Sequence, residues 1–136
     1  MTQPPVLILG ARSDIARATA QAFAEAGHPL QLAARRAATL AADAKDLSIR
    51  HDVPVTTHEF DAVETQTHDA FLSGLPELPG IVVCAVGALG DQDEDQSDPA
   101  AGLRTMRANF EGPAHILAYL ANAFERRGSG TIVGIS

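Results

Sequence analysis

Strand-like segments alternate with segments of helical spacing along the whole chain, and this alternation constrains the fold more than any other feature of the sequence. The strand-like segments span residues 5–9, 29–34, 54–60, 80–87 and 130–136. The helical patterns lie between them, at residues 14–26, 37–51, 64–75 and about 100–127. Unbroken runs of Val, Ile and Leu, such as PVLIL at 5–9, are typical of parallel strands that are covered on both faces.

Strands joined by helices of this length form right-handed crossovers, which produce a parallel sheet with helices on both faces. We therefore predict a doubly wound, Rossmann-like α/β fold with three αβα layers and the strand order 3-2-1-4-5. Residues 1–136 are expected to form a single domain. The strand order reverses between the first and the fourth strand, and ligands bind at the carboxyl ends of the strands at such a point. Gly10 and Gly87 follow these two strands.

Residues that flank the helical segments fit helix ends. Gly27 follows the first helix, at the position where glycine ends many helices. Ser13 or Asp14 is expected to cap the N-terminus of that helix. We favour Asp14, because a carboxylate interacts favourably with the helix dipole there. Within the long last helical region, Gly112 and Pro113 predict an interruption.

The charge balance and the single cysteine exclude several classes of protein. The chain has a net charge of −7 and its basic residues are nine Arg and one Lys, Lys45, so it lacks the basic tract of a nucleic-acid surface. Cys84 is the only cysteine, which excludes a disulfide within the chain and fits a reducing cytosol. The first residues have neither a basic signal region nor an apolar run long enough to span a membrane. We expect a cytoplasmic protein.

The first loop predicts an anion site. Gly10 allows a tight turn out of the first strand, and the following helix directs free backbone N–H groups at an anion. A glycine that serves turn geometry alone is the alternative.

The second strand ends in Ala-Ala-Arg-Arg, at residues 33–36. An NAD site usually has an Asp or Glu there, about 20 residues after the glycine loop, to bind the ribose 2′-OH. Arg35 can instead bind a 2′-phosphate through two hydrogen bonds. A solvated arginine pair is the alternative, but the missing acid favours NADP over NAD.

Other candidate sites are weaker. The acidic segment 91–98 lacks the glycine and glutamate of a calcium loop, so a solvated loop is expected there. The histidines show no metal-ligand spacing, and no metal is predicted. Cys84 is expected to be a core residue rather than a nucleophile.

Six segments, LGARSDIA, LAARR, FDA, CAVGALG, RANFEGP and GTIVGIS, resemble the short-chain dehydrogenase/reductase family in their order and spacing. The family's first loop has the pattern Thr-Gly-x-x-x-Gly-x-Gly. This chain keeps Gly10 but has Leu9 in place of the threonine and Asp14 and Ala16 in place of the other glycines. CAVG, at 84–87, stands where the family has Asn-Asn-Ala-Gly.

The resemblance implies a set of cofactor-binding residues at the matching positions. Those of the first loop would hold the pyrophosphate, Arg35 the 2′-phosphate, and Asp61 with Ala62 the adenine ring. The full set is Gly10, Arg12, Ser13, Asp14, Ile15, Arg35, Asp61, Ala62, Ala85, Val86 and Gly87. Asn109 matches the asparagine that, in the family, holds a water of the proton relay, and it is the candidate catalytic residue.

The family's catalytic Ser and Tyr-x-x-x-Lys have no match in this chain. Four residues after Tyr119 comes Ala123, and Ser136 resembles the residue just before the catalytic serine. We expect the chain to be the cofactor half of a longer enzyme and to be inactive alone.

The resemblance implies hydride transfer between NADP(H), or less readily NAD(H), and a small alcohol or carbonyl substrate. A non-catalytic nucleotide-binding or regulatory module is the alternative, favoured by the missing glycines, and an epimerase-type relative is a third. The apolar helix 114–124 is expected to pack on the sheet. Helices of this region form dimer interfaces in the family, so a homo-oligomer is also allowed.

Overall fold

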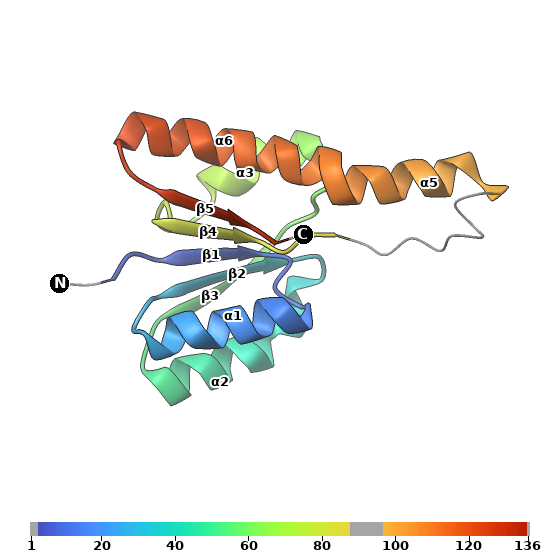
Figure 1. Cartoon of the computed structure of the whole chain (residues 1–136). Coiled ribbons are helices and arrows are strands. Elements are labelled where there is room, and N and C mark those ends of the chain that lie inside the picture. Colours follow the sequence, from blue (N-terminus) through green and yellow to red (C-terminus); the bar gives the residue numbers. More distant parts are fainter. Residues whose placement is uncertain (1–2, 88–96, 136) are drawn as a thin grey trace.

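The computed structural model describes residues 3–87 and 97–135 and contains a five-stranded parallel sheet with the order β3-β2-β1-β4-β5 (Figure 1). The strands are β1 (Val6–Leu9), β2 (Leu30–Ala34), β3 (Val55–Glu59), β4 (Ile81–Cys84) and β5 (Thr131–Gly134). The predicted Rossmann-like fold and its strand order are confirmed. Leu9 lies in register with Ala33 of β2 and with Cys84 of β4, so the three strands end level with one another.

Helices cover the sheet on both faces and complete three layers (Figure 1). On one face lie α1 (Asp14–Glu25), the short 3₁₀ helix η1 (Ala37–Leu40) and α2 (Ala41–His51). On the other lie η2 (Thr65–Thr67), α3 (His68–Ser73), α5 (Pro99–Met106), η3 (Arg107–Glu111) and α6 (Gly112–Arg127). None of the helices among the described residues is both long and apolar enough to cross a membrane.

Alternate residues of β1 enter two separate cores. Val6 and Ile8 pack with the α1–α2 layer, whereas Leu7 and Leu9 pack with α6. All four side chains are completely buried. A strand that is covered on both faces needs apolar side chains at every position, so it appears as a continuous apolar run in the sequence. The run in β1 therefore indicates a central strand of the sheet.

The start of α1 corrects one prediction. Ser13, not Asp14, is the N-cap, because its hydroxyl oxygen accepts a hydrogen bond from the Ala16 backbone N–H at 3.2 Å. Asp14 is the first helical residue, where its carboxylate still faces the positive end of the helix dipole. Ser13 has the extended backbone that an N-cap adopts, with φ −70° and ψ 155°, whereas Asp14 is already helical. At the other end Gly27 has a φ of +92°, as predicted for the residue that follows the helix.

The long helical region runs from α5 to α6 through a π-helical segment, η3, rather than through a break. The Gly112 N–H donates to the Arg107 carbonyl, five residues back. Pro113 has no N–H and cannot donate to the carbonyl four residues before it, which disfavours a regular α-helical ladder here. The predicted interruption at Gly112 and Pro113 is therefore a change of helix type immediately before them.

Candidate functional site

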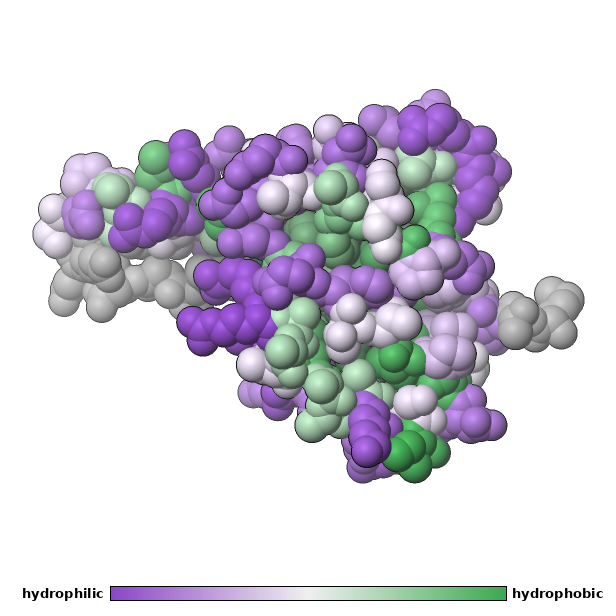
Figure 2. All heavy atoms as spheres, turned by 180° about the vertical axis from the view of Figure 1, so that it is seen from behind, coloured by the Kyte–Doolittle hydropathy of each residue, from purple (hydrophilic) through white to green (hydrophobic). Residues whose placement is uncertain are grey.

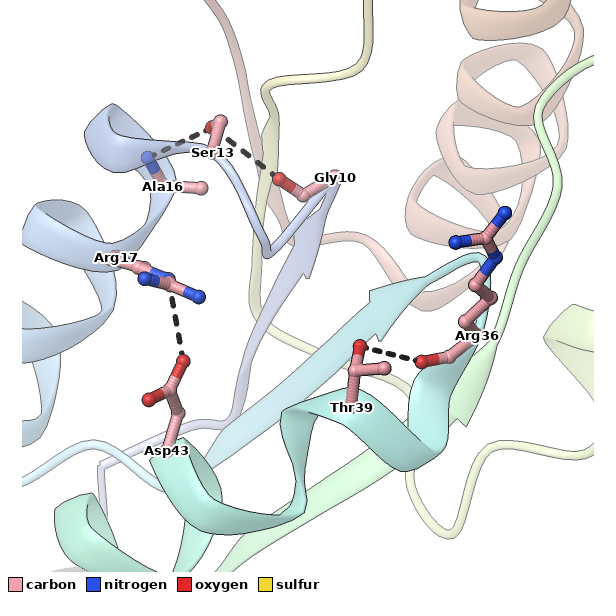
Figure 3. Close-up of polar contacts among 7 residues, drawn as sticks. All are labelled: Gly10, Ser13, Ala16, Arg17, Arg36, Thr39 and Asp43. Atoms are coloured by element: carbon pink, nitrogen blue, oxygen red, sulfur yellow. Dashed lines mark hydrogen bonds and ion pairs between the residues drawn. The ribbon is translucent and has the colours of Figure 1, made fainter.

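The loop after β1 turns at Gly10, whose φ is +83°. The N–H groups of Gly10 and Ala11 both donate to the Ala33 carbonyl of β2, at 2.9 and 3.1 Å. The Ser13 hydroxyl lies between the Gly10 carbonyl and the first turn of α1 (Figure 3). The loop therefore presents the N-terminus of a capped twelve-residue helix at the carboxyl end of the central strand.

Gly10 also lies directly against the segment that follows β4. A Cβ atom added to Gly10 would lie 2.8 Å from the Ala85 carbonyl oxygen and 3.0 Å from the Val86 nitrogen. These are backbone atoms, which cannot move aside as a flexible side chain can. The Ala85 N–H donates to the Leu9 carbonyl at 2.8 Å and fixes the approach. The two loops thus meet where the strand order reverses, and only glycine fits between them.

The segment after β4 continues to Gly87, which faces the π-helical segment. A Cβ atom at Gly87 would lie 3.0 Å from Oδ1 of Asn109. Asn109 is exposed and belongs to η3. A π-helical turn rotates the side chains that follow it, and such turns are frequent at functional sites. The fold therefore brings the predicted Asn109 to the predicted Gly87.

The turn after β3 contains the predicted pair Asp61 and Ala62. The Asp61 carboxylate accepts a hydrogen bond from the Val63 N–H at 3.0 Å, which closes the turn on itself. The turn packs closely on α6, because a Cβ atom at Gly112 would overlap the Ala62 carbonyl. Ala62 is buried and Asp61 is half-buried.

The turn after β2 donates hydrogen bonds to a carboxylate that the sequence analysis did not place there. Arg36 adopts a left-handed conformation with a φ of +55°. The carboxylate of Glu59, from the end of β3, accepts hydrogen bonds from the N–H groups of Arg36 and Ala37, both at 3.0 Å. Arg35 precedes this turn and is exposed. An acid from the next strand thus lies beside the end of β2, and both of its oxygens accept hydrogen bonds from the turn itself.

An ion pair joins the two helices that start at these loops. Nε of Arg17, on α1, lies 3.3 Å from the carboxylate of Asp43, on α2 (Figure 3). Both side chains are about half exposed, so the pair contributes little to stability. It does bridge the helices that follow the turns at Gly10 and at Arg36, which lie at the ends of neighbouring strands (Figure 3).

The burial of three further residues singled out in the sequence, Arg12, Ile15 and Cys84, differs from one to the next. Arg12 is half-buried in the first loop, and Ile15 is 53% exposed on the first turn of α1. Cys84 is buried at the end of β4, and burial raises the pKa of its thiol, so it is a core residue as predicted. Among residues 3–87 and 97–135, no group of His, Cys, Asp or Glu side chains could hold a metal ion. Most of the acidic segment 91–98 lies outside the described residues.

The parallel sheet, its order reversal and the glycine turn at the reversal define a Rossmann-like α/β protein. The family model for short chain dehydrogenases matches residues 5–136. The chain belongs to the short-chain dehydrogenase family, a family of oxidoreductases.

Individual relatives agree with this assignment. An uncharacterized oxidoreductase of Mycobacterium tuberculosis is 34% identical over 135 residues, covering 97% of this chain and 54% of the relative. Among solved structures, a short-chain dehydrogenase from Sphingobium yanoikuyae in complex with NADPH is 28% identical with a TM-score of 0.86, covering 98% of this chain and 54% of that one. A bulky-bulky ketone specific alcohol dehydrogenase from Comamonas testosteroni is 26% identical with a TM-score of 0.87, covering 100% and 55%. The chain thus spans about half the length of the curated relatives it matches.

Proposed function

We propose that residues 1–136 form the nicotinamide-dinucleotide unit of an oxidoreductase that transfers hydride between NADP(H) and a small alcohol or carbonyl compound. The contact of Gly10 with the Ala85–Val86 backbone carries this proposal. This contact places the α1 N-terminus at the crevice where ligands of such sheets bind. A relative of the same family holds NADPH on the same fold.

The residues of the first loop fit a pyrophosphate. Gly10 lets the loop turn tightly out of β1 while the Ala85–Val86 backbone fills the space of its missing side chain. The helix dipole and the first-turn N–H groups of α1 favour an anion there. Ser13 and Arg12 flank this end of the helix, and Arg12 supplies the only positive side chain of the loop. Asp14 adds a negative charge, which reduces the electrostatic attraction.

The turn after β2 supports NADP over NAD through Arg35 and opposes it through Glu59. A guanidinium group binds a phosphate more strongly than a hydroxyl group. Glu59 already occupies the Arg36 and Ala37 N–H groups and adds a negative charge close to them. Because Arg35 and Arg36 carry two positive charges against this one, we propose a preference for NADP.

The nicotinamide ring, when bound, supplies or accepts the hydride. Ala85, Val86 and Gly87 would lie along the cofactor at the end of β4, and Asn109 would hold a water beside Gly87. Tyr119 lies on α6 with its ring 5.1 Å from the His115 ring, and no lysine follows it at the fourth position. We therefore assign the acid that protonates the carbonyl to the part of the relatives' length that this chain does not span.

The test is a titration of the full-length protein with NADPH and NADH, followed by a screen of carbonyl compounds for NADPH oxidation. We expect NADPH to bind more tightly than NADH and at least one ketone or aldehyde to be reduced. Equal affinities would remove the argument from Arg35. No binding of either dinucleotide would overturn the proposed function.

A non-catalytic nucleotide-binding module is the second candidate. It is favoured by Ala16, a fully buried residue at the position of the family's third loop glycine, because its methyl group fills space beneath the loop. This candidate predicts that NADPH binds in the titration while no compound in the screen is reduced.

A further inference from the structure

Two histidines from different elements contact each other behind the turn at Asp61 and Ala62. His68 begins α3 and is completely buried, and His115 lies on α6 and is half-buried. Their Nδ1 atoms are 2.8 Å apart. Nε2 of His68 lies 3.1 Å from the Asp61 carbonyl oxygen. The three groups therefore form a hydrogen-bonded chain from α6 through α3 to the predicted adenine turn.

The donor and acceptor groups of this hydrogen-bonded chain determine which ring nitrogens carry hydrogen. A carbonyl oxygen can only accept, so Nε2 of His68 must carry a hydrogen and donate it to Asp61. A neutral His68 then has a bare Nδ1 that accepts, and Nδ1 of His115 must be the donor. A proton added to Nδ1 of His68 would reverse this bond, so that His115 must accept at Nδ1 and carry its own hydrogen on Nε2. The added charge would then lie on a completely buried ring.

The surroundings of His68 favour its neutral form. The Phe60 ring lies 5.1 Å from the His68 ring, and Phe71 packs on Phe60 at 4.7 Å. Burial among these rings lowers the pKa of His68 below the ordinary value of 6.5, and repulsion from His115 adds to this. Hydrogen bonding to the Asp61 backbone and the Asp61 charge act in the opposite direction but do not prevail.

Other titratable groups near the pair lie farther out. On the α6 side, the Tyr119 ring packs 5.1 Å from the His115 ring. On the β3 side, the His58 ring lies 6.5 Å from the Phe71 ring and its Nε2 bonds the Thr56 hydroxyl. Near η2, the Glu64 carboxylate accepts a hydrogen bond from Gln66. None of these bonds involves a ring nitrogen of His68.

We propose that His68 and His115 are positioning residues for the adenine end of the cofactor site, holding the Asp61–Ala62 turn against α6 in the shape that binds adenine. This inference rests on the proposed function. It predicts that the affinity for the adenosine half of the cofactor, and not for the nicotinamide half, depends on the pair and falls on acidification.

The experiment compares two ligand fragments on the full-length protein. Adenosine 2′,5′-bisphosphate carries the adenosine end, and reduced nicotinamide mononucleotide carries the other end. We expect His68→Leu and His115→Leu each to weaken NADPH and the bisphosphate about tenfold, the effect of an unsatisfied buried hydrogen-bonding group. The affinity for the mononucleotide should stay unchanged.

A conservative variant separates positioning from packing. The amide of Gln at position 68 can still donate to the Asp61 carbonyl but does not titrate. His68→Gln should keep NADPH affinity within about threefold of the wild type at pH 7.5, since one hydrogen bond of the chain is retained. It should make the loss of NADPH affinity between pH 7.5 and 5.5 smaller than in the wild type, and the remaining loss comes from protonation of the 2′-phosphate, whose second pKa is about 6. His58→Gln is the control, because it removes a nearby histidine outside the chain of hydrogen bonds.

Each outcome bears on one proposal or both. Equal weakening of both fragments, or no weakening of either, overturns the positioning role while the proposed function stands. A wild-type protein that binds no dinucleotide overturns both. If the leucine variants fail to fold, the pH profile of His68→Gln decides: a profile as steep as that of the wild type overturns the inference.

Discussion

At the residue scale, single atoms decide whether the loops of the candidate site can meet. Gly10 and Gly27 have nearly the same positive φ, but their surroundings differ. A Cβ atom at Gly10 would meet the backbone of Ala85 and Val86, whereas at Gly27 it would meet nothing within 4 Å. Substitutions at the two positions can therefore distinguish the free-energy cost of a left-handed backbone from that of a steric clash.

Gly10→Ala should destabilise the protein more than Gly27→Ala. The conformational strain of alanine costs about 1–2 kcal/mol in both variants, and the contact with Ala85 adds roughly 1–3 kcal/mol in the first. Urea unfolding of the two variants measures the difference. NADPH affinity should fall only for Gly10→Ala. Equal destabilisation would mean that the loops separate without cost, and the proposed role of their contact would be wrong.

Glu59→Gln should increase the preference for NADPH over NADH. The substitution removes one negative charge beside the turn that follows Arg35, while an amide oxygen can still accept one of the two backbone hydrogen bonds. Unit charges roughly 4–8 Å apart in water interact by about 0.5–1 kcal/mol, which corresponds to a change of roughly two- to fivefold in the ratio of the two dissociation constants. Glu125→Gln, on the far end of α6, is the charge-matched control. An unchanged ratio would place Glu59 outside the range of the 2′-phosphate.

At the scale of elements, the ends of the helices carry the candidate site. The α1 helix begins at the Ser13 cap and directs its N-terminus at the crevice. The η3 segment interrupts the α-helical ladder and presents Asn109 to Gly87.

In Figure 2 the α5–α6 layer is mainly hydrophilic, with hydrophobic residues towards its α5 end. Leu103, Met106 and Phe110 are exposed in α5 and η3.

Ser13→Ala should cost about 1 kcal/mol of folding free energy, because it removes the hydroxyl that accepts from the Ala16 N–H. Asp14→Ala should change stability little. It loses a favourable interaction with the helix dipole, but alanine has the higher helix propensity, and these effects are each a few tenths of a kcal/mol. Thermal and urea unfolding at pH 7.5 measure both variants. A larger loss for Asp14→Ala would reassign the cap.

At the scale of the whole molecule, two buried cores hold the sheet, one on each of its faces. The two cores meet at β1, whose side chains enter them alternately. The edge strand β5 is exposed along its whole length, including Ile132 and Val133. An exposed edge strand can pair with another chain.

The stability of the molecule should fall between pH 7.5 and 5.5. Burial lowers the pKa of His68 and of His58 below 6.5. Above pH 6.5 both groups are neutral in the folded and the unfolded chain, and their contribution to stability is fully present. As the pH falls towards the folded-state pKa, the unfolded chain binds more protons, and stability is lost. Urea midpoints across this range measure the effect, and His68→Gln should reduce its slope; an unchanged slope would assign the dependence to other groups.

Much of the fold is predictable from the sequence, and less of the site. The bounds of β1 and α1, and the glycine that follows α1, agree with the local patterns to within one residue. The strand β4 is shorter than the apolar run 80–87, because its last residues turn away to meet Gly10. The choice of Ser13 over Asp14 as the cap depended on the residue at which the backbone becomes helical. Both residue types are good N-caps, so their pattern in the sequence does not decide between them.

The alternation of apolar runs and helical patterns by itself determined the Rossmann-like sheet, its order and the crevice at Gly10. Periodicity identifies each strand and helix from neighbouring residues, and the right-handed crossover rule then orders the strands. Only the tertiary structure decided which side chains meet across it. The Glu59 carboxylate reaches the Arg36 turn from another strand, and His68 contacts His115 from 47 positions away. Such contacts depend on how two elements pack and on atomic distances within them, and no local pattern in the sequence records either.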